Sequence, residues 1–179
     1  MFFKPEAEEV VSTATVYSGR LLKVKKMEVK LSGRAHLREV VEHPGAVALI
    51  PILGDEIILI RQFRLAAGRM LYEIPAGTLG RAEIPEKCAA RELAEETGYV
   101  AGRLEMLLRC FLAPGYSTEV VYFYLATELR PSTQRLEEDE SIEVCPTPLR
   151  RAFEMAYTNE IEDAKTLLGI MLCQRYLSS

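Results

Sequence analysis

The sequence stretch that decides the fold is GTLGRAEIPEKCAARELAEETGY, residues 77–99. Helical spacing of the apolar residues runs from Pro85 to Thr97, and Gly98 follows directly. Proline in the first turn and glycine just past the end are the residues that typically bound a helix. We therefore predict a helix over 85–97, preceded by a stretch rich in small residues at 74–80.

This predicted helix carries a cluster of acidic residues. Glu92 and Glu96 are four residues apart and share a face, while Glu95 lies three residues from Glu92 and flanks it. Carboxylates this close repel one another, and a hard divalent cation such as Mg²⁺ or Mn²⁺ would offset that repulsion. Arg91, four residues before Glu95, is placed to hydrogen-bond it and hold its orientation. The cluster therefore predicts a divalent metal site on the helix.

The alternative for these acids is a solvated helix face without a ligand, and the spacing of Gly77 and Glu83 from the helix argues against it. The whole stretch resembles the signature of the Nudix hydrolases, which is long and gapped and therefore specific. Only Tyr99 departs from it, in a place that the family fills with a bulky aliphatic residue, where it should occupy the same packing site. The fixed positions are met by Gly77, Glu83, Arg91, Glu92, Leu93, Glu95, Glu96 and Gly98.

The resemblance implies an α+β protein with the Nudix fold, in which a mixed β-sheet is sandwiched between α-helices. It implies cleavage of a nucleoside diphosphate linked to another group. The metal, Mg²⁺ with Mn²⁺ as an alternative, would be bound by Glu92 and Glu96 with help from Glu95 and the Ala76 carbonyl.

A narrower resemblance, to the ADP-ribose pyrophosphatase branch, covers nearly the whole chain. It includes Pro114, fifteen residues after Tyr99, where that branch has a proline. The branch hydrolyses ADP-ribose to AMP and ribose 5-phosphate, and its members are homodimers that exchange N-terminal sheets. The runs that carry the resemblance are residues 38–47, 61–64, 73–77, 113–115, 138–140 and 163–166, together with Glu119.

The same resemblance implies substrate-binding residues. Arg64 would hold the diphosphate from the side opposite the metal, Arg38 would reach across the dimer toward the nucleotide, and Glu119 would help to bind ADP-ribose. For both arginines the alternative is a surface salt bridge, and for Glu119 it is a surface acid on a loop.

A general base is expected in the loop over residues 136–140, which carries four acids. By match to the family we assign Glu138, with Glu140 as a metal contact or substitute. Glu95 is the next candidate base, and Arg91 completes the catalytic set. The alternative for the loop is a solubilising acidic segment.

Two other functions stay open. The chain would then be a Nudix hydrolase of another nucleoside diphosphate sugar or of a dinucleotide, or a non-catalytic Nudix domain that only binds a ligand. Domains of the latter kind tend to lose signature carboxylates, which this chain keeps.

Upstream of the signature, alternation predicts three short antiparallel strands over 15–19, 22–31 and 37–41. Such a sheet has no core of its own and needs the rest of the chain or a second copy to cover it. We therefore expect residues 1–42 to form a dimerisation region and residues 43–179 to form the Nudix domain.

The main sheet is predicted to begin with a hairpin of strands 46–53 and 56–64 around Gly54-Asp55. Further strands are expected over 104–112, 120–126 and 142–145, with a surface loop over 130–140. Helical spacing predicts two more helices over 149–157 and 164–176.

Composition limits the partners. A formal charge of −4 over 179 residues gives no electrostatic basis for binding nucleic acid, and no apolar run is long enough to cross a membrane. The segment MFFKPEAEEVV does not read as a signal peptide, so we expect a cytoplasmic protein. Four scattered cysteines and two histidines argue against a zinc site, and whether any cysteines pair stays open.

Overall fold

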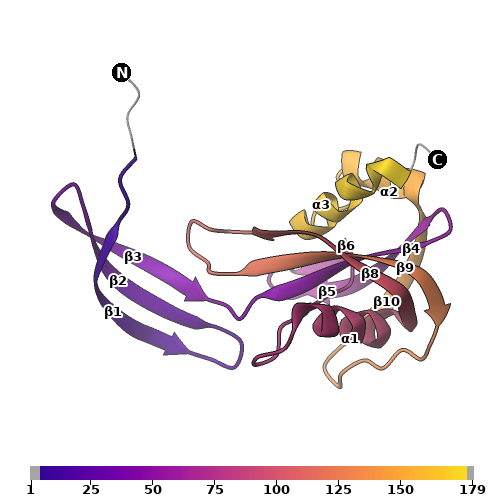
Figure 1. Ribbon diagram of the computed structural model, residues 1–179, viewed down its shortest axis with the longest axis horizontal. Helices are drawn as coiled ribbons and strands as arrows, with labels where there is room; N and C mark the ends of the chain where they lie inside the picture. The colour runs from indigo at the N-terminus through magenta and orange to yellow at the C-terminus, as the bar shows by residue number, and fades with distance from the viewer. Residues whose placement is uncertain (1–4, 177–179) are drawn as a thin grey trace. The chain divides into compact units, whose positions relative to one another are not determined.

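The computed structural model describes residues 5–176 and divides into two compact units (Figure 1). The first unit consists of Met1–Gly45 with Phe111–Val120, and the second of Ala46–Cys110 with Val121–Ser179. The grouping of residues 111–120 with the N-terminal segment was not predicted from the sequence.

The first unit is an antiparallel sheet of three strands in the order β1-β2-β3. The three predicted antiparallel strands are present, but the first begins at Glu9 rather than residue 15 and the third begins at Arg34 rather than residue 37. Every residue of β1 is exposed, and Val29, at 2% exposure, is the one buried side chain of the three strands. The sheet therefore has no core of its own, as expected. Its strands are β1 (Glu9–Ser18), β2 (Lys23–Leu31) and β3 (Arg34–Glu42).

The second unit is built on a seven-stranded mixed sheet. Its main path runs β10-β5-β4-β9-β8, with β6 paired to β5 and β7 paired to β4. Strand β4 is parallel to β9 and antiparallel to β5 and β7. The strands are β4 (Ala46–Leu53), β5 (Glu56–Arg64), β6 (Arg69–Glu73), β7 (Ala76–Thr78), β8 (Tyr99–Phe111), β9 (Val120–Pro131) and β10 (Ile142–Pro148). The helices are α1 (Pro85–Thr97), α2 (Leu149–Tyr157), α3 (Ala164–Leu172) and a 3₁₀ turn, η1 (Cys173–Tyr176).

Helices cover both faces of this sheet, with α1 on one face and α2 and α3 on the other (Figure 1). The alternating side chains of β4 show why. Val47 and Leu49 pack in one core with Leu93 of α1, whereas Ala48 and Ile50 pack in the other core with residues of α2 and α3. All four β4 side chains are completely buried, as expected for a strand that is covered on both faces. The predicted sandwich is confirmed.

The element boundaries differ from the prediction in several places. Strands β6 and β7 were not predicted. Strand β8 begins at Tyr99 rather than residue 104, β9 continues to Pro131, and β10 continues to Pro148. The last helix ends at Leu172, because the chain there tightens into η1.

Within residues 5–176, no helix is both long enough and apolar enough to span a membrane. Cys88 and Cys173 are buried, Cys110 and Cys145 are half-buried, and no disulfide bond joins these four residues.

Candidate active site

A closed loop leads from β7 into α1. The helix begins at Pro85, and its N-cap residue Ile84 offers no side-chain acceptor to the first turn. Glu83 closes the loop instead. Its carboxylate accepts a hydrogen bond from the Gly80 N–H (2.8 Å), and its own N–H donates to the Gly80 carbonyl (3.0 Å). At the other end of the helix, Gly98 adopts the left-handed conformation (φ 71°) and donates its N–H to the Ala94 carbonyl.

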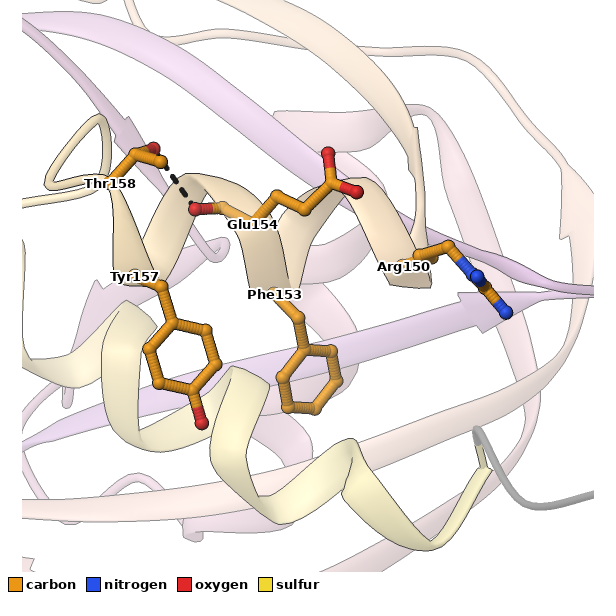
Figure 2. Close-up of a pocket in the computed structure, with 5 residues that line it drawn as sticks. All are labelled: Arg150, Phe153, Glu154, Tyr157 and Thr158. Carbon is orange, nitrogen blue, oxygen red and sulfur yellow. Dashed lines mark hydrogen bonds between the residues drawn. The ribbon is translucent and has the colours of Figure 1, made fainter.

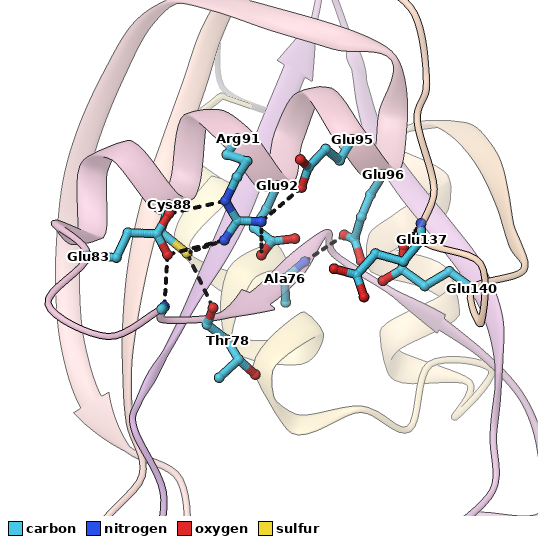
Figure 3. A network of polar contacts seen from close by, with 11 residues as sticks. Ala76, Thr78, Glu83, Cys88, Arg91, Glu92, Glu95, Glu96, Glu137 and Glu140 are labelled. Carbon is cyan, nitrogen blue, oxygen red and sulfur yellow. Dashed lines mark hydrogen bonds and ion pairs between the residues drawn. The ribbon is translucent and has the colours of Figure 1, made fainter. Parts of the chain in front are cut away.

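Arg91 lies between three signature carboxylates (Figure 3). Its Nε donates to Glu83 (3.1 Å), and its Nη1 lies 2.8 Å from an oxygen of Glu92 and 2.8 Å from an oxygen of Glu95. The hydrogen bond expected between Arg91 and Glu95 is thus present. Hydrogen bonds from Arg91 and the Gly80 N–H hold the pKa of Glu83 down at about 2. Arg91 therefore fastens the loop to the helix.

The fold buries two of the carboxylates deeply. Glu92 is 9% exposed and Glu96 is 3% exposed. One oxygen of Glu96 accepts a hydrogen bond from the Ala76 N–H (2.9 Å). Burial is the main cause that raises the pKa of Glu92 and that raises the pKa of Glu96 to about 8, and the charge of Glu140 contributes to both shifts. This pair is short of positive charge, a condition typical of sites that bind a cation.

Gly77 is required by the position of Glu92. A Cβ atom at Gly77 would lie 1.9 Å from Cδ of Glu92 and 2.0 Å from one of its oxygens. The Glu92 carboxylate therefore lies directly against the backbone of the loop, and any side chain at residue 77 would displace it.

The donors suit a hard divalent cation in their chemistry, because they are carboxylate oxygens beside a loop backbone. In the part of the chain that the structure describes, no three His, Cys, Asp or Glu side chains converge closely enough to hold a metal ion as they lie. Arg91 pairs with Glu92 and Glu95, and Glu96 is bonded to the Ala76 N–H. A metal would therefore require these side chains to turn toward it.

Arg64, expected to bind substrate, lies at the end of β5 in a bidentate ion pair with Glu73. Its Nε and Nη2 each donate to one oxygen of Glu73 at 2.7 Å. Glu73 is 1% exposed and also accepts a hydrogen bond from Lys165 (2.5 Å). The bonds to Glu73 raise the pKa of Arg64, and the charge of Glu96 raises it further. The structure thus brings Arg64 within electrostatic range of the buried carboxylates.

The acidic loop brings Glu140 toward the helix, and Figure 3 shows Glu137 and Glu140 beside Glu96. Glu140 is half-buried, and one of its oxygens accepts a hydrogen bond from the Glu137 N–H (2.9 Å). Glu138, the residue assigned as the base, is exposed. Its catalytic role stays a prediction, and of the two residues it is Glu140 that faces the buried pair.

Sequence reasoning missed how this loop is attached. The side chain of Gln134 donates to the Glu96 carbonyl (2.7 Å), and the Arg135 N–H donates to the Glu95 carbonyl (3.0 Å). A glutamine in a polar loop carries no distinctive signal in a single sequence.

Arg38 and Glu119, the other expected substrate residues, belong to the first unit. Arg38 donates from Nε to Glu8 (3.0 Å) and from Nη1 to the Leu37 carbonyl (3.0 Å), so it forms the surface salt bridge considered as its alternative. An oxygen of Glu119 lies 3.8 Å from Nδ1 of His43. Their roles toward a substrate stay predictions.

A separate hollow of about 410 Å³ lies along α2, on the sheet face opposite α1 (Figure 2). Glu154 is the one acid in its lining, and it pairs with Arg151 (3.7 Å), so the lining offers a single carboxylate. We therefore assign the active site to the α1 face. The hollow is lined by Arg150, Phe153, Glu154, Tyr157 and Thr158.

Comparison with known sequences finds a matching family model and several similar proteins. A family model described as NUDIX domain matches residues 42–168. ADP-ribose pyrophosphatase of Bacillus subtilis (strain 168) is 38% identical over 171 residues, covering 93% of this chain and 92% of that protein. The methanol dehydrogenase activator of Bacillus methanolicus is 34% identical, with the same coverage of both chains. GDP-mannose pyrophosphatase of Salmonella arizonae (strain ATCC BAA-731 / CDC346-86 / RSK2980) is 38% identical over 144 residues, covering 74% of this chain and 75% of that protein.

Comparison with solved structures supports the fold. The crystal structure of an ADP compounds hydrolase matches with a TM-score of 0.86 at 23% identity, covering 99% of this chain and 97% of that one. The family model spans most of the chain, and the signature carboxylates lie where the loop and helix bring them together. The chain therefore belongs to the Nudix hydrolase family.

Proposed function

We propose that this protein hydrolyses the pyrophosphate bond of ADP-ribose to AMP and ribose 5-phosphate in a reaction that needs a divalent metal. The observation that carries the proposal is the buried pair of Glu92 and Glu96 in a complete signature, with Glu92 against Gly77 and Glu96 bonded to the Ala76 N–H. The substrate follows from similarity over nearly the whole chain to a relative named ADP-ribose pyrophosphatase.

Glu92 and Glu96 would hold Mg²⁺ or Mn²⁺, with Glu95 and the Ala76 carbonyl as further ligands. A bound ion would supply positive charge against the diphosphate oxygens. Arg91 would release Glu92 and Glu95 to the metal while it keeps Glu83 and the loop in place.

Arg64 would hold the diphosphate from the other side, because its guanidinium is fixed by Glu73 and lies within electrostatic range of Glu96. A carboxylate of the acidic loop would accept the proton of the attacking water. Glu138 is the base by family match, and Glu140 is the alternative that the described contacts favour.

A homodimer through the N-terminal sheet is part of this proposal. The exposed apolar side chains of β1 support it, because a sheet without a core needs another surface to cover it. Arg38 and Glu119 would then contribute to binding the nucleotide. A cytoplasmic location is expected as well.

The test is a substrate panel with the purified protein and Mg²⁺, in which kcat/KM is measured for ADP-ribose, GDP-mannose, a dinucleoside diphosphate and nucleoside triphosphates. We expect ADP-ribose to give the highest value. Higher kcat/KM for GDP-mannose would favour the second candidate, a pyrophosphatase of another nucleoside diphosphate sugar, for which the Salmonella relative is the supporting observation. A preference for triphosphates would contradict both.

A further inference from the structure

The acidic loop continues from residues 132–135, and this segment is fastened to the C-terminal end of α1 by three hydrogen bonds between described residues. The Ser132 N–H donates to the Gly98 carbonyl (2.6 Å), the Arg135 N–H to the Glu95 carbonyl (3.0 Å), and the Gln134 side-chain amide to the Glu96 carbonyl (2.7 Å). The last carbonyls of a helix have no partner within the helix, so they need partners from outside. Gln134 is the one side chain among these three donors.

Gly98 lets the loop come this close. A Cβ atom at Gly98 would lie 3.1 Å from the backbone nitrogen of Gln134 and 3.5 Å from the Ser132 carbonyl oxygen. The signature glycine thus serves two purposes: it ends the helix with a left-handed residue, and it leaves space for the loop.

The same loop carries Glu140, whose carboxylate faces the buried pair of Glu92 and Glu96. Glu140 follows Gln134 by six residues, and its carboxylate closes a turn with the Glu137 N–H (2.9 Å). The carbonyls bonded by Arg135 and Gln134 belong to Glu95 and Glu96, whose side chains lie in the site. The attachment therefore fixes both the loop and the helix turn that it faces.

We propose that Gln134 is a positioning residue. The hydrogen bond from its side-chain amide to the Glu96 carbonyl holds the acidic loop so that the Glu140 carboxylate faces Glu92 and Glu96. The inference rests on the proposed function for its catalytic consequence, but the attachment itself can be tested without substrate. Gln134 touches no reacting group and acts through the loop.

The chemistry of the bond predicts which substitutions preserve it. The partner is a carbonyl at the negative end of the helix, so residue 134 must donate a hydrogen bond, and a positive charge is also favourable there. Gln134→Lys keeps a donor, whereas Gln134→Ala removes it. Gln134→Glu places a carboxylate beside the carbonyl and the negative helix end. We expect the attachment to survive in the lysine variant alone.

The first experiment is steady-state kinetics with ADP-ribose and Mg²⁺. We expect Gln134→Ala and Gln134→Glu to lower kcat by about 10- to 100-fold with KM within about twofold of wild type, because a misplaced catalytic group costs rate rather than binding. Gln134→Lys should recover most of the loss. The control is Thr133→Ala, on the same loop, which should match wild type. Equal kcat for wild type and Gln134→Ala would overturn the proposal.

A double-mutant cycle separates positioning from general damage to the fold. In a Glu140→Gln, Glu138→Gln background the loop has lost its candidate bases, so Gln134→Ala should cause no further loss of kcat. If Gln134→Ala lowered kcat in that background as much as it does in wild type, the proposal would be overturned, because the effect would not depend on the carboxylates of the loop.

The second experiment is hydrogen exchange of the metal-free protein, which needs neither substrate nor activity. Peptides that span residues 132–140 should exchange faster in Gln134→Ala than in wild type, Gln134→Lys or Thr133→Ala, while peptides from β4 and β5 stay unchanged. Unchanged exchange over 132–140 would overturn the proposal. If wild type leaves ADP-ribose intact but exchange changes as expected, the proposed function fails and the attachment stands.

Discussion

Glu92 and Glu96 are buried acids, and their burial disfavours the charged form of each carboxyl group. Among the described residues, Glu96 accepts a hydrogen bond from the Ala76 N–H alone, and Glu92 shares Arg91 with two other carboxylates. A carboxylate that is kept buried with so little compensation serves stability poorly and suits a cation-binding role. Loss of such a carboxylate should therefore lower activity without lowering stability.

We predict that Glu96→Gln lowers the Mg²⁺-dependent kcat at least about 100-fold while the metal-free protein melts at the same or a higher temperature than wild type. The amide removes an ionisable group whose charged form burial disfavours, and it removes a metal ligand, but it keeps the shape of the side chain. The control on the same helix is Glu86→Gln, whose parent residue is exposed in the first turn. Kinetics and thermal melts in EDTA check both effects, and a large fall in melting temperature with activity retained would contradict the assignment.

The attachment of the loop to the C-terminal end of α1 predicts an effect on stability. Gly98→Ala should destabilise the protein by more than Gly54→Ala, although both glycines have similar positive φ angles of 71° and 62°. The left-handed conformation costs an alanine about 1 kcal/mol in either case. At Gly54 a Cβ meets nothing within 4 Å, whereas at Gly98 it meets the Gln134 backbone at 3.1 Å.

Urea denaturation of the two alanine variants measures this difference directly. The excess destabilisation of Gly98→Ala over Gly54→Ala reports the loop contact alone, because the conformational cost cancels. Equal losses of unfolding free energy in the two variants would show that the loop leaves room for a Cβ atom at residue 98.

Glu73 ties β6 to β5 and α3 through Arg64 and Lys165. Burial alone would raise the pKa of Glu73, but hydrogen bonds from the two cations outweigh it, and the folded-state pKa is lowered from 4.5. A carboxyl group with a lowered pKa contributes stability that is fully present above its unfolded pKa and is lost as pH falls through its folded pKa. The ion pairs should therefore stabilise the protein at neutral pH and cease to do so in acid.

We predict that Glu73→Gln lowers the free energy of unfolding by about 2 kcal/mol at pH 7, since it leaves the half-buried Arg64 and Lys165 without their charged partner. The difference from wild type should shrink as pH falls below about 4.5. Urea denaturation at pH 7 and at several acidic values checks this. A difference that stays constant or grows toward acid would contradict the lowered pKa.

The elements that could be predicted from sequence are those with a long or well-bounded pattern. Helix α1 was predicted to the residue because Pro85 and Gly98 are strong boundary signals. Strands β6 and β7 were missed because they have five and three residues, too few for a period to show. Strand β9 continues past the predicted end at residue 126 through Glu128, whose φ is +56°, because the apolar run that predicted the strand ends before the strand does.

The candidate site divides in the same way. The signature spacing predicted the carboxylates, because residues on one helix have fixed relative positions. The bidentate pair of Arg64 and Glu73 joins two strands, and the bond from Gln134 to the Glu96 carbonyl joins a loop to a helix end. Contacts of this kind depend on how the chain returns to a site, and a local pattern does not contain that information.

The exposed sheet of the first unit predicts association of two copies. Val16 and Tyr17 of β1 are 61% and 56% exposed, and such apolar side chains gain from being covered. We expect light scattering at micromolar concentration to give the mass of a dimer. Val16→Asp should shift it toward monomer, whereas Tyr157→Asp, on the exposed surface of α2, should not. A monomeric wild type would contradict the dimer.

If the dimer forms, Arg38→Ala should raise KM for ADP-ribose by more than it lowers kcat, because the residue would bind the nucleotide and take no part in the chemistry. Kinetics of the dimeric variant, with its mass checked by light scattering, test this. A change confined to kcat would contradict a binding role.

The carboxylate pair of α1 is proposed to serve hydrolysis of the pyrophosphate bond of ADP-ribose. The most direct measurement is to incubate the wild-type protein with ADP-ribose and Mg²⁺ and to identify the products by chromatography and mass spectrometry. We predict equal amounts of AMP and ribose 5-phosphate, with neither formed in excess EDTA. Intact ADP-ribose, or cleavage to ADP and ribose, would contradict pyrophosphate hydrolysis by this pair.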